Sequence, residues 1–393
     1  MSKIKIGVFG AWRGSSYIDI MSTDSDFEIV AVCDKNADAL ENKDPEIRVF
    51  TDFDSFLAYG REAGMNAVFL ANYFHQHTPF AVKAMNAGMD VLSECTASST
   101  LAECVELVET VEKTGRKYML CENYPFSDEM VKMNEIISGG SLGTLLYAEG
   151  EYNHSEDNEG LRRLTPGPYH WRAWMPRTYY ITHSLGPIMY LTKSEVRYVS
   201  ARAAHSDLLY KIKDWRHNFD GMAMMLCEMT GGLTARVTGC TAMASDYSRY
   251  RVCGDISSVE SGGYIPGGKV RQFYFNHTKP EGLESNVIMH ESTPLSGGNS
   301  SGHGGGDYRT VQNIKAYLLG GEKPFFDVYR AVNMSATAIL AWRSCLNHGE
   351  NFRVPDFRNP GERAAVRDDN LTPFPDENGS GATLPPALNY EKE

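Results

Sequence analysis

This chain of 393 residues lacks the features that mark several classes of protein. No apolar run reaches the roughly 18 residues that a transmembrane helix needs, so we expect no membrane partner. Basic residues are few, 38 against 50 acidic ones, and the longest basic cluster is Arg162-Arg163. Because a net charge of −12 leaves no basic surface that could release counterions, we expect no nucleic-acid partner either.

Cysteine is also scarce, with eight residues at scattered spacings and no CxxC pair. This usage excludes a disulfide framework and favours buried thiols in a reducing compartment. The first expected strand begins within a few residues of Met1, which leaves no room for a signal peptide. We therefore expect a cytoplasmic protein, although a chain trimmed of its leader would look the same. His75 and His77 have no carboxylate or cysteine at useful spacing, so we expect no metal site.

Residues 1–123 alternate apolar strands with helices, which indicates a parallel sheet covered on both faces. The clearest helix is expected over 101–114, where Thr100 and Glu103 form a capping box and Gly115 ends the helix. The expected strands are Ile4–Phe9, Phe27–Cys33, Ala67–Ala71, Val91–Leu92 with its neighbours, and Tyr118–Cys121. The pattern predicts an α/β dinucleotide-binding domain over 1–123.

Residues 124–366 have the pattern of a second, α+β domain. Alternating runs at 145–154, 196–205, 219–229 and 233–241, with further short strands in 250–275, predict a mostly antiparallel sheet that is open on one face. Helices are expected at 128–138, 310–319 and 327–347, a hairpin turn at Gly231-Gly232, and a flexible loop at 296–307. The polar tail 367–393 is expected either to wrap a surface or to be disordered.

The stretch IKIGVFGAWRGSSYI reads as a strand, a glycine turn and a helix start. Gly10 stands where a dinucleotide fingerprint has its first glycine, Trp12 takes the place of the second, and Gly14 gives the string G-x-W-R-G. Asp34 follows Gly10 by 24 residues, which suits a contact with the ribose hydroxyls and favours NAD over NADP. We expect Arg13 to pair with phosphates, and Trp12 to lie against the cofactor or merely to cover the turn. The alternative is a nucleotide-free domain with an ordinary strand–helix turn.

Residues 66–103 read NAVFLANYFHQHTPFAVKAMNAGMDVLSECTASSTLAE and resemble the glucose–fructose oxidoreductase / inositol dehydrogenase / MocA (Gfo/Idh/MocA) family. The resemblance continues through ENYPFSDEM, GSLGTLLYAEGEYNH, THSLGPI, GHGGGDY and VPDF, and so covers nearly the whole chain. It implies a Rossmann domain that binds NAD, and a second domain whose open sheet face forms the substrate pocket and often a dimer interface. A homodimer or homotetramer is therefore expected. By position it also implies cofactor contacts from Asn72, His77, Glu94 and Asn123.

One motif departs from the family pattern. The Glu-Lys-Pro of the family is Glu94-Cys95-Thr96 here, and Cys95 cannot replace the lysine that helps to move the proton of the substrate hydroxyl. The strings WRAW, YITHSLGP and GHGGGDY are similar to the NAD-dependent glycosidases of the α-N-acetylgalactosaminidase type, in which that lysine is also missing. The similarity to this branch implies four catalytic residues, namely Tyr152, Arg172, Tyr180 and His183.

These residue types suit the chemistry. Oxidation of a sugar hydroxyl needs a hydride acceptor and a base for the O–H proton, and a histidine, or a tyrosine relaying to it, can serve as that base. Each side chain also has an ordinary structural alternative. His183 would then be a structural histidine, hydrogen-bonded within the fold before a turn. Tyr152 or Tyr180 would pack in the core, and Arg172 would form a structural ion pair. His303, amid glycines, is either a pocket-loop residue or simply exposed.

Three functions fit these observations. The first is an NAD-dependent oxidoreductase that acts on a sugar or glycoside hydroxyl by hydride transfer, which the generality of the family and the expected lack of a leader favour. The second is a redox-assisted glycosidase or lyase with tightly bound, recycled NAD, which the missing lysine and the Tyr-x-x-His pair favour. The third is a cofactor-bound regulatory protein without turnover, against which the polar pocket segments argue.

Overall fold

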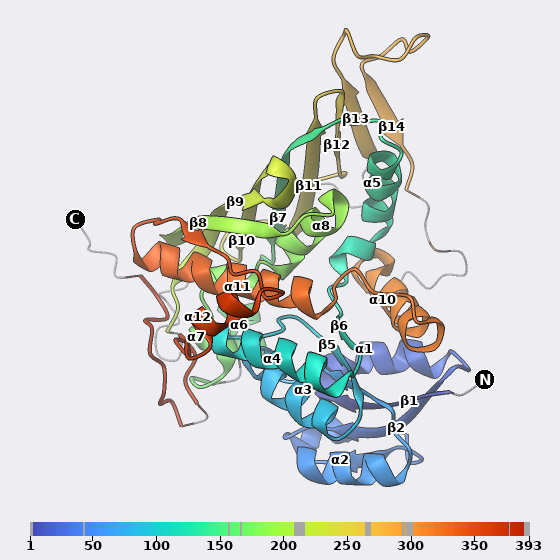
Figure 1. The fold of residues 1–393 in the computed structure, drawn as a ribbon, viewed down its shortest axis with the longest axis vertical. Coiled ribbons are helices and arrows are strands. Elements are labelled where there is room, and N and C mark those ends of the chain that lie inside the picture. Colours follow the sequence, from blue (N-terminus) through green and yellow to red (C-terminus); the bar gives the residue numbers. More distant parts are fainter. Residues whose placement is uncertain are drawn as a thin grey trace. The chain divides into compact units, whose positions relative to one another are not determined.

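The fold is taken from a computed structural model, which describes residues 3–41, 44–155, 158–165, 167–207, 217–263, 269–292, 295, 302–376 and 378–388 (Figure 1). The chain divides into two compact units. Unit 1 consists of residues 1–123, 298–335 and 357–370, and unit 2 consists of 124–297, 336–356 and 371–393. Two segments that the sequence pattern placed beyond the first domain, 298–335 and 357–370, therefore lie in the unit that holds the N-terminus.

Unit 1 contains a six-stranded parallel sheet with the strand order β3-β2-β1-β4-β5-β6, which is the order of a Rossmann fold. Its strands are β1 (Ile4–Phe9), β2 (Phe27–Cys33), β3 (Arg48–Phe50), β4 (Ala67–Leu70), β5 (Asp90–Ser93) and β6 (Tyr118–Leu120). All are predicted from their apolar runs except β3, which is short and largely exposed. The predicted α/β architecture of this domain is confirmed.

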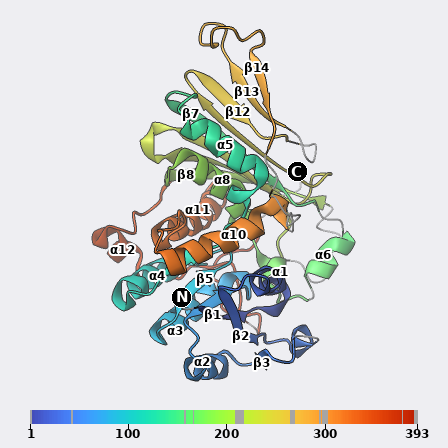
Figure 2. The same ribbon diagram turned by 90° about the vertical axis from the view of Figure 1, so that its right-hand side faces the viewer.

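Helices cover this sheet. They are α1 (Ala11–Ser22), α2 (Phe53–Glu62), α3 (His77–Asn86), α4 (Leu101–Thr114), α10 (Gly306–Lys315) and α12 (Pro360–Val366), with the π-helical turn η7 (Ala316–Gly320) after α10. Helix α4 has the predicted capping box between Thr100 and Glu103 and ends at Gly115 with a φ of 64°. Helix α10 is distant in sequence from α1 but packs beside it (Figure 2), and its Val311 and Ile314 complete the core around β1.

Unit 2 is built on a nine-stranded sheet with the order β14-β13-β12-β11-β7-β10-β9-β8-β15. Its strands are β7 (Leu145–Asn153), β8 (Val196–His205), β9 (Asp220–Met229), β10 (Thr234–Cys240), β11 (Tyr247–Gly254), β12 (Ser257–Glu260), β13 (Val270–Tyr274), β14 (Val287–His290) and β15 (Phe352–Arg353). Only β7 and β10 pair in parallel, so the predicted mostly antiparallel sheet is confirmed. The hairpin between β9 and β10 turns at Gly231 and Gly232, both with positive φ, as expected.

Helices lie on one face of this sheet. Helix α8 (Thr182–Thr192) packs on β7, β10 and β11, and α5 (Asp128–Ser138) packs on β12 and β13 (Figure 2). Between β7 and α8 lie α6 (Asn158–Leu164), α7 (Trp171–Trp174) and the 3₁₀ turn η4 (Arg177–Tyr180). The predicted 327–347 helix is α11 (Val328–Leu346), which contributes residues to both units.

The expected loop and tail are only partly visible. Residues 296–301 of the loop predicted at 296–307 lie outside the described residues, while His303–Gly305 forms a 3₁₀ turn, η6, that leads into α10. The tail wraps unit 2: Phe374 is buried against Tyr179, and the indole of Trp342 donates to the carbonyl of Pro385 at 3.0 Å. Among the helices of the described residues, none combines the length and the apolar character that a membrane span requires.

Candidate functional site

Two glycines shape the turn between β1 and α1. Gly10 has a φ of 102°, and a Cβ atom built on it would lie 2.2 Å from the carbonyl carbon of Ala71. A Cβ atom on Gly14 would lie 2.6 Å from Cγ1 of Val8, so α1 packs directly on β1. Trp12 stands between them and is 73% exposed. The chain thus has the close approaches that the first and third fingerprint glycines provide, and an exposed ring near the middle place.

The carboxylate of Asp34 binds the start of the same helix. Its Oδ2 accepts a hydrogen bond from the backbone N–H of Ala11 at 2.7 Å, and its Oδ1 accepts one from Asn36 at 2.9 Å. The carboxyl end of β2 is therefore held at the N-terminus of α1. In a Rossmann fold this edge receives the ribose and pyrophosphate of a dinucleotide.

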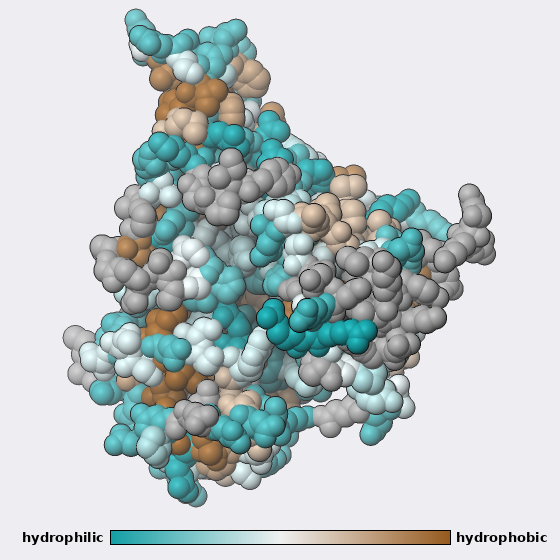
Figure 3. Space-filling view, turned by 180° about the vertical axis from the view of Figure 1, so that it is seen from behind, coloured by the Kyte–Doolittle hydropathy of each residue, from teal (hydrophilic) through white to brown (hydrophobic). Residues whose placement is uncertain are grey.

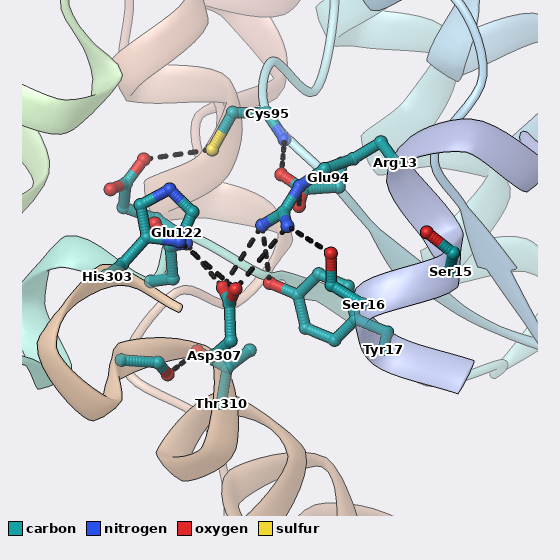
Figure 4. Close-up of polar contacts among 12 residues, drawn as sticks. Arg13, Ser15, Ser16, Tyr17, Glu94, Cys95, Glu122, His303, Asp307 and Thr310 are labelled. Carbon is teal, nitrogen blue, oxygen red and sulfur yellow. Dashed lines mark hydrogen bonds and ion pairs between the residues drawn. The ribbon is translucent and has the colours of Figure 1, made fainter. Parts of the chain in front are cut away.

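Arg13 lies at the centre of a charged network that joins α1, β5 and α10 (Figure 4). Its Nε atom is 2.7 Å from Oε1 of Glu94, and one terminal nitrogen is 3.1 Å from Oδ1 of Asp307. Asp307 also accepts a hydrogen bond from Asn123 at 2.6 Å and contacts Nδ1 of His303 at 3.0 Å. The guanidinium of Arg13 thus has two carboxylate partners, and its expected pairing with cofactor phosphates stays a prediction.

The network stabilises the ionised form of Asp307. Burial alone would raise the pKa of this carboxyl, but the hydrogen bond from His303 and the charge of Arg13 lower it well below its usual value. A guanidinium held between two carboxylates is a strong, directional link. It fixes the start of α10 against α1, beside the glycine turn.

Asn72 lies in the loop after β4, and His77 is the first residue of α3. His77 is fully buried, with Nδ1 2.7 Å from the carbonyl oxygen of Thr96 and Nε2 3.3 Å from that of Asn72. Burial lowers its pKa, so the ring is neutral at pH 7 and has one N–H to donate. The carbonyl oxygen of Thr96 is the nearer acceptor for it. Neither amide atom of the Asn72 side chain has a hydrogen-bond partner, although both are buried, and the same holds for Oδ1 of Asn123. Such orphaned atoms fit a bound polar group.

Cys95 occupies the place of the missing lysine. Its thiol donates a hydrogen bond to Oε2 of Glu122 at 2.9 Å, and Glu122 is completely buried. Its backbone N–H donates to Oε2 of Glu94 at 3.2 Å. No flexible ammonium group stands at this position.

Unit 2 gathers four aromatic side chains around one histidine. The ring of His183, in the first turn of α8, has its centroid 4.4 Å from that of Tyr124, 5.0 Å from Tyr152 and 5.5 Å from Tyr180. These residues come from the 3₁₀ turn η3 (Tyr124–Phe126), β7 and η4 respectively. The hydroxyl of Tyr250 donates to the carbonyl oxygen of His183 at 2.5 Å. The arrangement holds a half-buried imidazole among phenol hydroxyls.

The tyrosines and Arg172 have distinct chemical roles. Burial, together with nearby Tyr180 and Tyr124, raises the pKa of Tyr152 well above its usual value, so Tyr152 remains a hydrogen-bond donor at neutral pH. The guanidinium of Arg172 lies over the ring of Trp171 at 4.4 Å and over that of Tyr180 at 5.4 Å. Stacked in this way it keeps its N–H groups available to a ligand.

The predicted residues fall into two sets. All nine predicted cofactor residues lie in unit 1, and all four predicted catalytic residues lie together in unit 2. Sequence reasoning missed Tyr124, Glu122 and Asp307, although each lies within a string that carried the family resemblance. It also missed Arg177, for which no local pattern gave a signal.

Residues 4–121 match the Gfo/Idh/MocA family, described as an oxidoreductase family with an NAD-binding Rossmann fold. The N-terminal domain belongs to the Gfo/Idh/MocA family. This match confirms the expected NAD-binding domain. The glycine turn, the placement of Asp34 and the orphaned amide of Asn72 fit that cofactor, with Gly10, Gly14 and Asp34 at the dinucleotide edge.

Other proteins are similar to this chain beyond the N-terminal domain. A glycosyl hydrolase family 109 protein of Saccharopolyspora erythraea is 26% identical, over 90% of this chain and 83% of its own length. An alpha-N-acetylgalactosaminidase of Shewanella oneidensis is 22% identical, over 91% of this chain and 85% of its own. Levoglucosan dehydrogenase, solved with NADH and L-sorbose, has the same fold with a TM-score of 0.73 and 14% identity, over 91% of this chain and all of that one.

The Arg13–Asp307 pair gives a testable prediction. We expect Asp307→Asn to lower the free energy of unfolding by about 2 kcal/mol at pH 7, because it leaves the partly buried guanidinium of Arg13 with only Glu94 as a carboxylate partner. The pKa of Asp307 is lower in the folded than in the unfolded chain, so its stabilisation is full above its ordinary pKa and fades as the pH falls below about 4. Urea unfolding at pH 7, 4 and 3 measures this difference.

The control is Asp38→Asn, an exposed carboxylate in the same unit, which we expect to change stability by less than about 0.5 kcal/mol. Equal stability of the Asp307→Asn and Asp38→Asn variants at pH 7 would show that the charged network does not hold α10 against α1.

Proposed function

We propose that this protein oxidises a hydroxyl group of a sugar or glycoside, with NAD as the hydride acceptor. The observation that carries the proposal is the position of His183 among Tyr124, Tyr152 and Tyr180, in a chain whose N-terminal domain belongs to an NAD-binding oxidoreductase family. The levoglucosan dehydrogenase with the same fold was solved with a sugar, L-sorbose, which supports this substrate class.

The side chains of unit 2 supply the acid–base chemistry of the proposal. An alcohol that loses hydride from carbon must also lose its O–H proton, and bound NAD takes only the hydride. His183 takes the proton, since imidazole is the side chain best suited to this near neutral pH. Tyr152, held protonated, donates a hydrogen bond to the substrate oxygen, and Arg172 orients neighbouring oxygens.

Redox-neutral cleavage of a glycoside is the second candidate function. The observation that favours it is Cys95, which hydrogen-bonds Glu122 where an oxidoreductase of the family would have a lysine. In this scheme oxidation of the C3 hydroxyl, with NAD as the hydride acceptor, would give a ketone that acidifies the C2 proton. A base of the aromatic cluster removes that proton and the C1 substituent leaves. Water then adds at C1, a proton returns to C2, and return of the hydride to C3 restores the hydroxyl. The names of the Saccharopolyspora erythraea and Shewanella oneidensis relatives support this candidate.

A single assay tests both functions. We would incubate the purified protein with a panel of nitrophenyl glycosides, with and without added NAD, and record nitrophenol release and NADH absorbance together. We expect NADH in proportion to oxidised substrate. Nitrophenol release without net NADH would instead establish the redox-neutral reaction. If neither signal appears with any glycoside while NAD still binds, the protein is a cofactor-bound protein without turnover, and the proposal fails.

We also infer a cytoplasmic location and a homo-oligomer. All eight cysteines, which the structure describes, are free thiols, and burial raises the pKa of those such as Cys104 and Cys227, as suits a reducing compartment. The face of the nine-stranded sheet opposite α5 and α8 carries cross-strand ion pairs, such as Arg271 with Glu260 at 2.8 Å. Complementary charges of this kind suit a symmetric interface.

Exposed apolar side chains support the same inference. Leu226 is about half exposed in β9, as is Met289 in β14. Figure 3 shows hydrophobic side chains gathered near the end of the sheet that carries β13 and β14. Such side chains at the margin of an open sheet favour a homodimer or homotetramer.

A further inference from the structure

A small pocket in unit 2 adjoins the aromatic cluster, with which it shares Tyr180 and Arg172. The chemistry above gives no role to the rest of its lining. Its polar lining comes from Arg172, Arg177, Thr165, Thr241, Tyr180 and His154, and its remaining walls are apolar. These residues lie on or next to β7, α6, α7, η4 and β10, all within unit 2. Tyr180 lines the pocket and also contacts the ring of His183, so the pocket and the aromatic cluster are neighbours.

Arg177 is a buried cation without a bound counter-charge. Only 4% of its surface is exposed, and its Nε atom has no hydrogen-bond partner. Burial and the charge of Arg172 lower its pKa, to about 10, so the guanidinium is still charged at pH 7. Buried Asp220 attracts it but is hydrogen-bonded by Asn218 at 3.1 Å. In the part of the chain that the structure describes, neither Arg177 nor Arg172 forms an ion pair through its guanidinium.

Two hydroxyl groups in the same lining also lack partners. The Oγ1 atoms of Thr165 and Thr241 are buried without a hydrogen bond, and these residues are 3% and 6% exposed. A buried charge and unsatisfied hydroxyls are costly unless a ligand pairs with them. Two guanidinium groups and two hydroxyl donors around one pocket match an oxyanion, which offers several acceptors and a negative charge.

We propose that this pocket binds an oxyanion of the substrate, namely a carboxylate, a sulfate ester or a phosphate ester. The protein then acts on acidic sugars or their glycosides. The conversion of acidic sugars rests on the proposed function, whereas the binding of the oxyanion in the pocket does not depend on it. Because the protein as a whole carries a net charge of −12, long-range attraction does not draw anions to it. Selection of an acidic sugar therefore depends on the local contacts of Arg172 and Arg177.

Binding is tested first, without turnover. Calorimetry with the NAD-loaded protein would compare glucuronate, galacturonate and the 6-sulfates and 6-phosphates of glucose and galactose with the neutral parent sugars. We expect at least one acidic sugar to bind at least tenfold more tightly than its parent, and the one that binds best identifies the anionic group. Equal affinity for every acidic sugar and its neutral parent would overturn the proposal.

Variants then assign the effect to the pocket. We expect Arg177→Gln to lower the affinity for the acidic sugar at least tenfold and to change the affinity for the neutral parent sugar less than twofold. Arg177→Lys should retain part of the preference for the acidic sugar. The matched control is Arg163→Gln, an exposed arginine of α6, which we expect to change neither affinity. A preference unchanged in Arg177→Gln would overturn the proposal. The wild-type comparison decides the matter if that variant does not fold.

Turnover separates this proposal from the proposed function. If acidic sugars bind through Arg177 but no glycoside or sugar is converted, the pocket assignment stands and the proposed reaction fails. If neutral glycosides are converted as well as acidic ones, and acidic sugars show no preferential binding, the reaction stands and the pocket assignment fails. Preferential conversion of an acidic glycoside, lost in Arg177→Gln through a raised KM, supports both.

Discussion

Replacement of His183 by alanine is expected to lower kcat at least about 100-fold on the best substrate of the glycoside panel, because general acid–base groups contribute 10²–10⁴-fold to rate. The half-buried imidazole is the base of the proposed reaction, and no lysine stands at the Cys95 position to take its place. NAD affinity should not change, since His183 lies in unit 2 and the NAD-binding domain lies in unit 1. Steady-state kinetics and NADH fluorescence titration measure the two quantities.

The matched control is His277→Ala, an exposed histidine of unit 2 between β13 and β14, which we expect to keep full activity. The backbone at position 183 should persist in the variant, because Tyr250 binds its carbonyl oxygen rather than its ring. Unchanged kcat in His183→Ala would refute the assignment of the base and with it the role given to the aromatic cluster.

Substitution of Gly10 by alanine is the second change with a large expected effect. The residue has a φ of 102°, and an added Cβ atom would meet the carbonyl carbon and oxygen of Ala71 at 2.2 Å. Backbone strain of about 1–3 kcal/mol and overlap of a similar size should together lower the free energy of unfolding by at least about 3 kcal/mol. NADH binding should be lost as well, because the turn that approaches the cofactor cannot keep its shape.

The Gly88→Ala variant separates the cost of backbone strain from the cost of steric overlap of the added Cβ atom. Gly88 has a similar φ of 90°, but a Cβ atom there would have nothing within 4 Å. We therefore expect a smaller loss of stability and normal NADH binding. Urea unfolding and NADH titration of both variants give the comparison. Equal denaturant midpoints and equal NADH affinities for the two would show that the close approach at Gly10 is not required.

The sequence predicted those parts of the fold that depend on local signals. β1 and β2 are apolar runs, and α4 has its capping box and terminal glycine within a few residues of its ends. β3 was missed because three largely exposed residues carry no periodic pattern. The assignment of 298–335 to unit 1 was missed because contacts between distant segments, such as Arg13 with Asp307, leave no mark in either segment.

The same distinction applies to the site. Tyr152, Tyr180 and His183 were chosen by resemblance, and the structure brings their rings together from β7, η4 and α8. Arg177 was missed because an arginine in a 3₁₀ turn looks like a surface residue until the fold buries it.

Unit 1 is built from three separate segments of the chain, and this affects how the protein folds during its synthesis. Val311 and Ile314 of α10 belong to the core around β1, yet roughly 180 residues are synthesised between Asn123 and this helix. At typical translation rates that interval lasts on the order of 10 to 40 seconds. Throughout it the nascent chain holds a dinucleotide-binding sheet with part of its apolar surface uncovered and Arg13 without Asp307. We therefore expect the sheet to complete its core, and to load its cofactor, only when the last quarter of the chain has been synthesised.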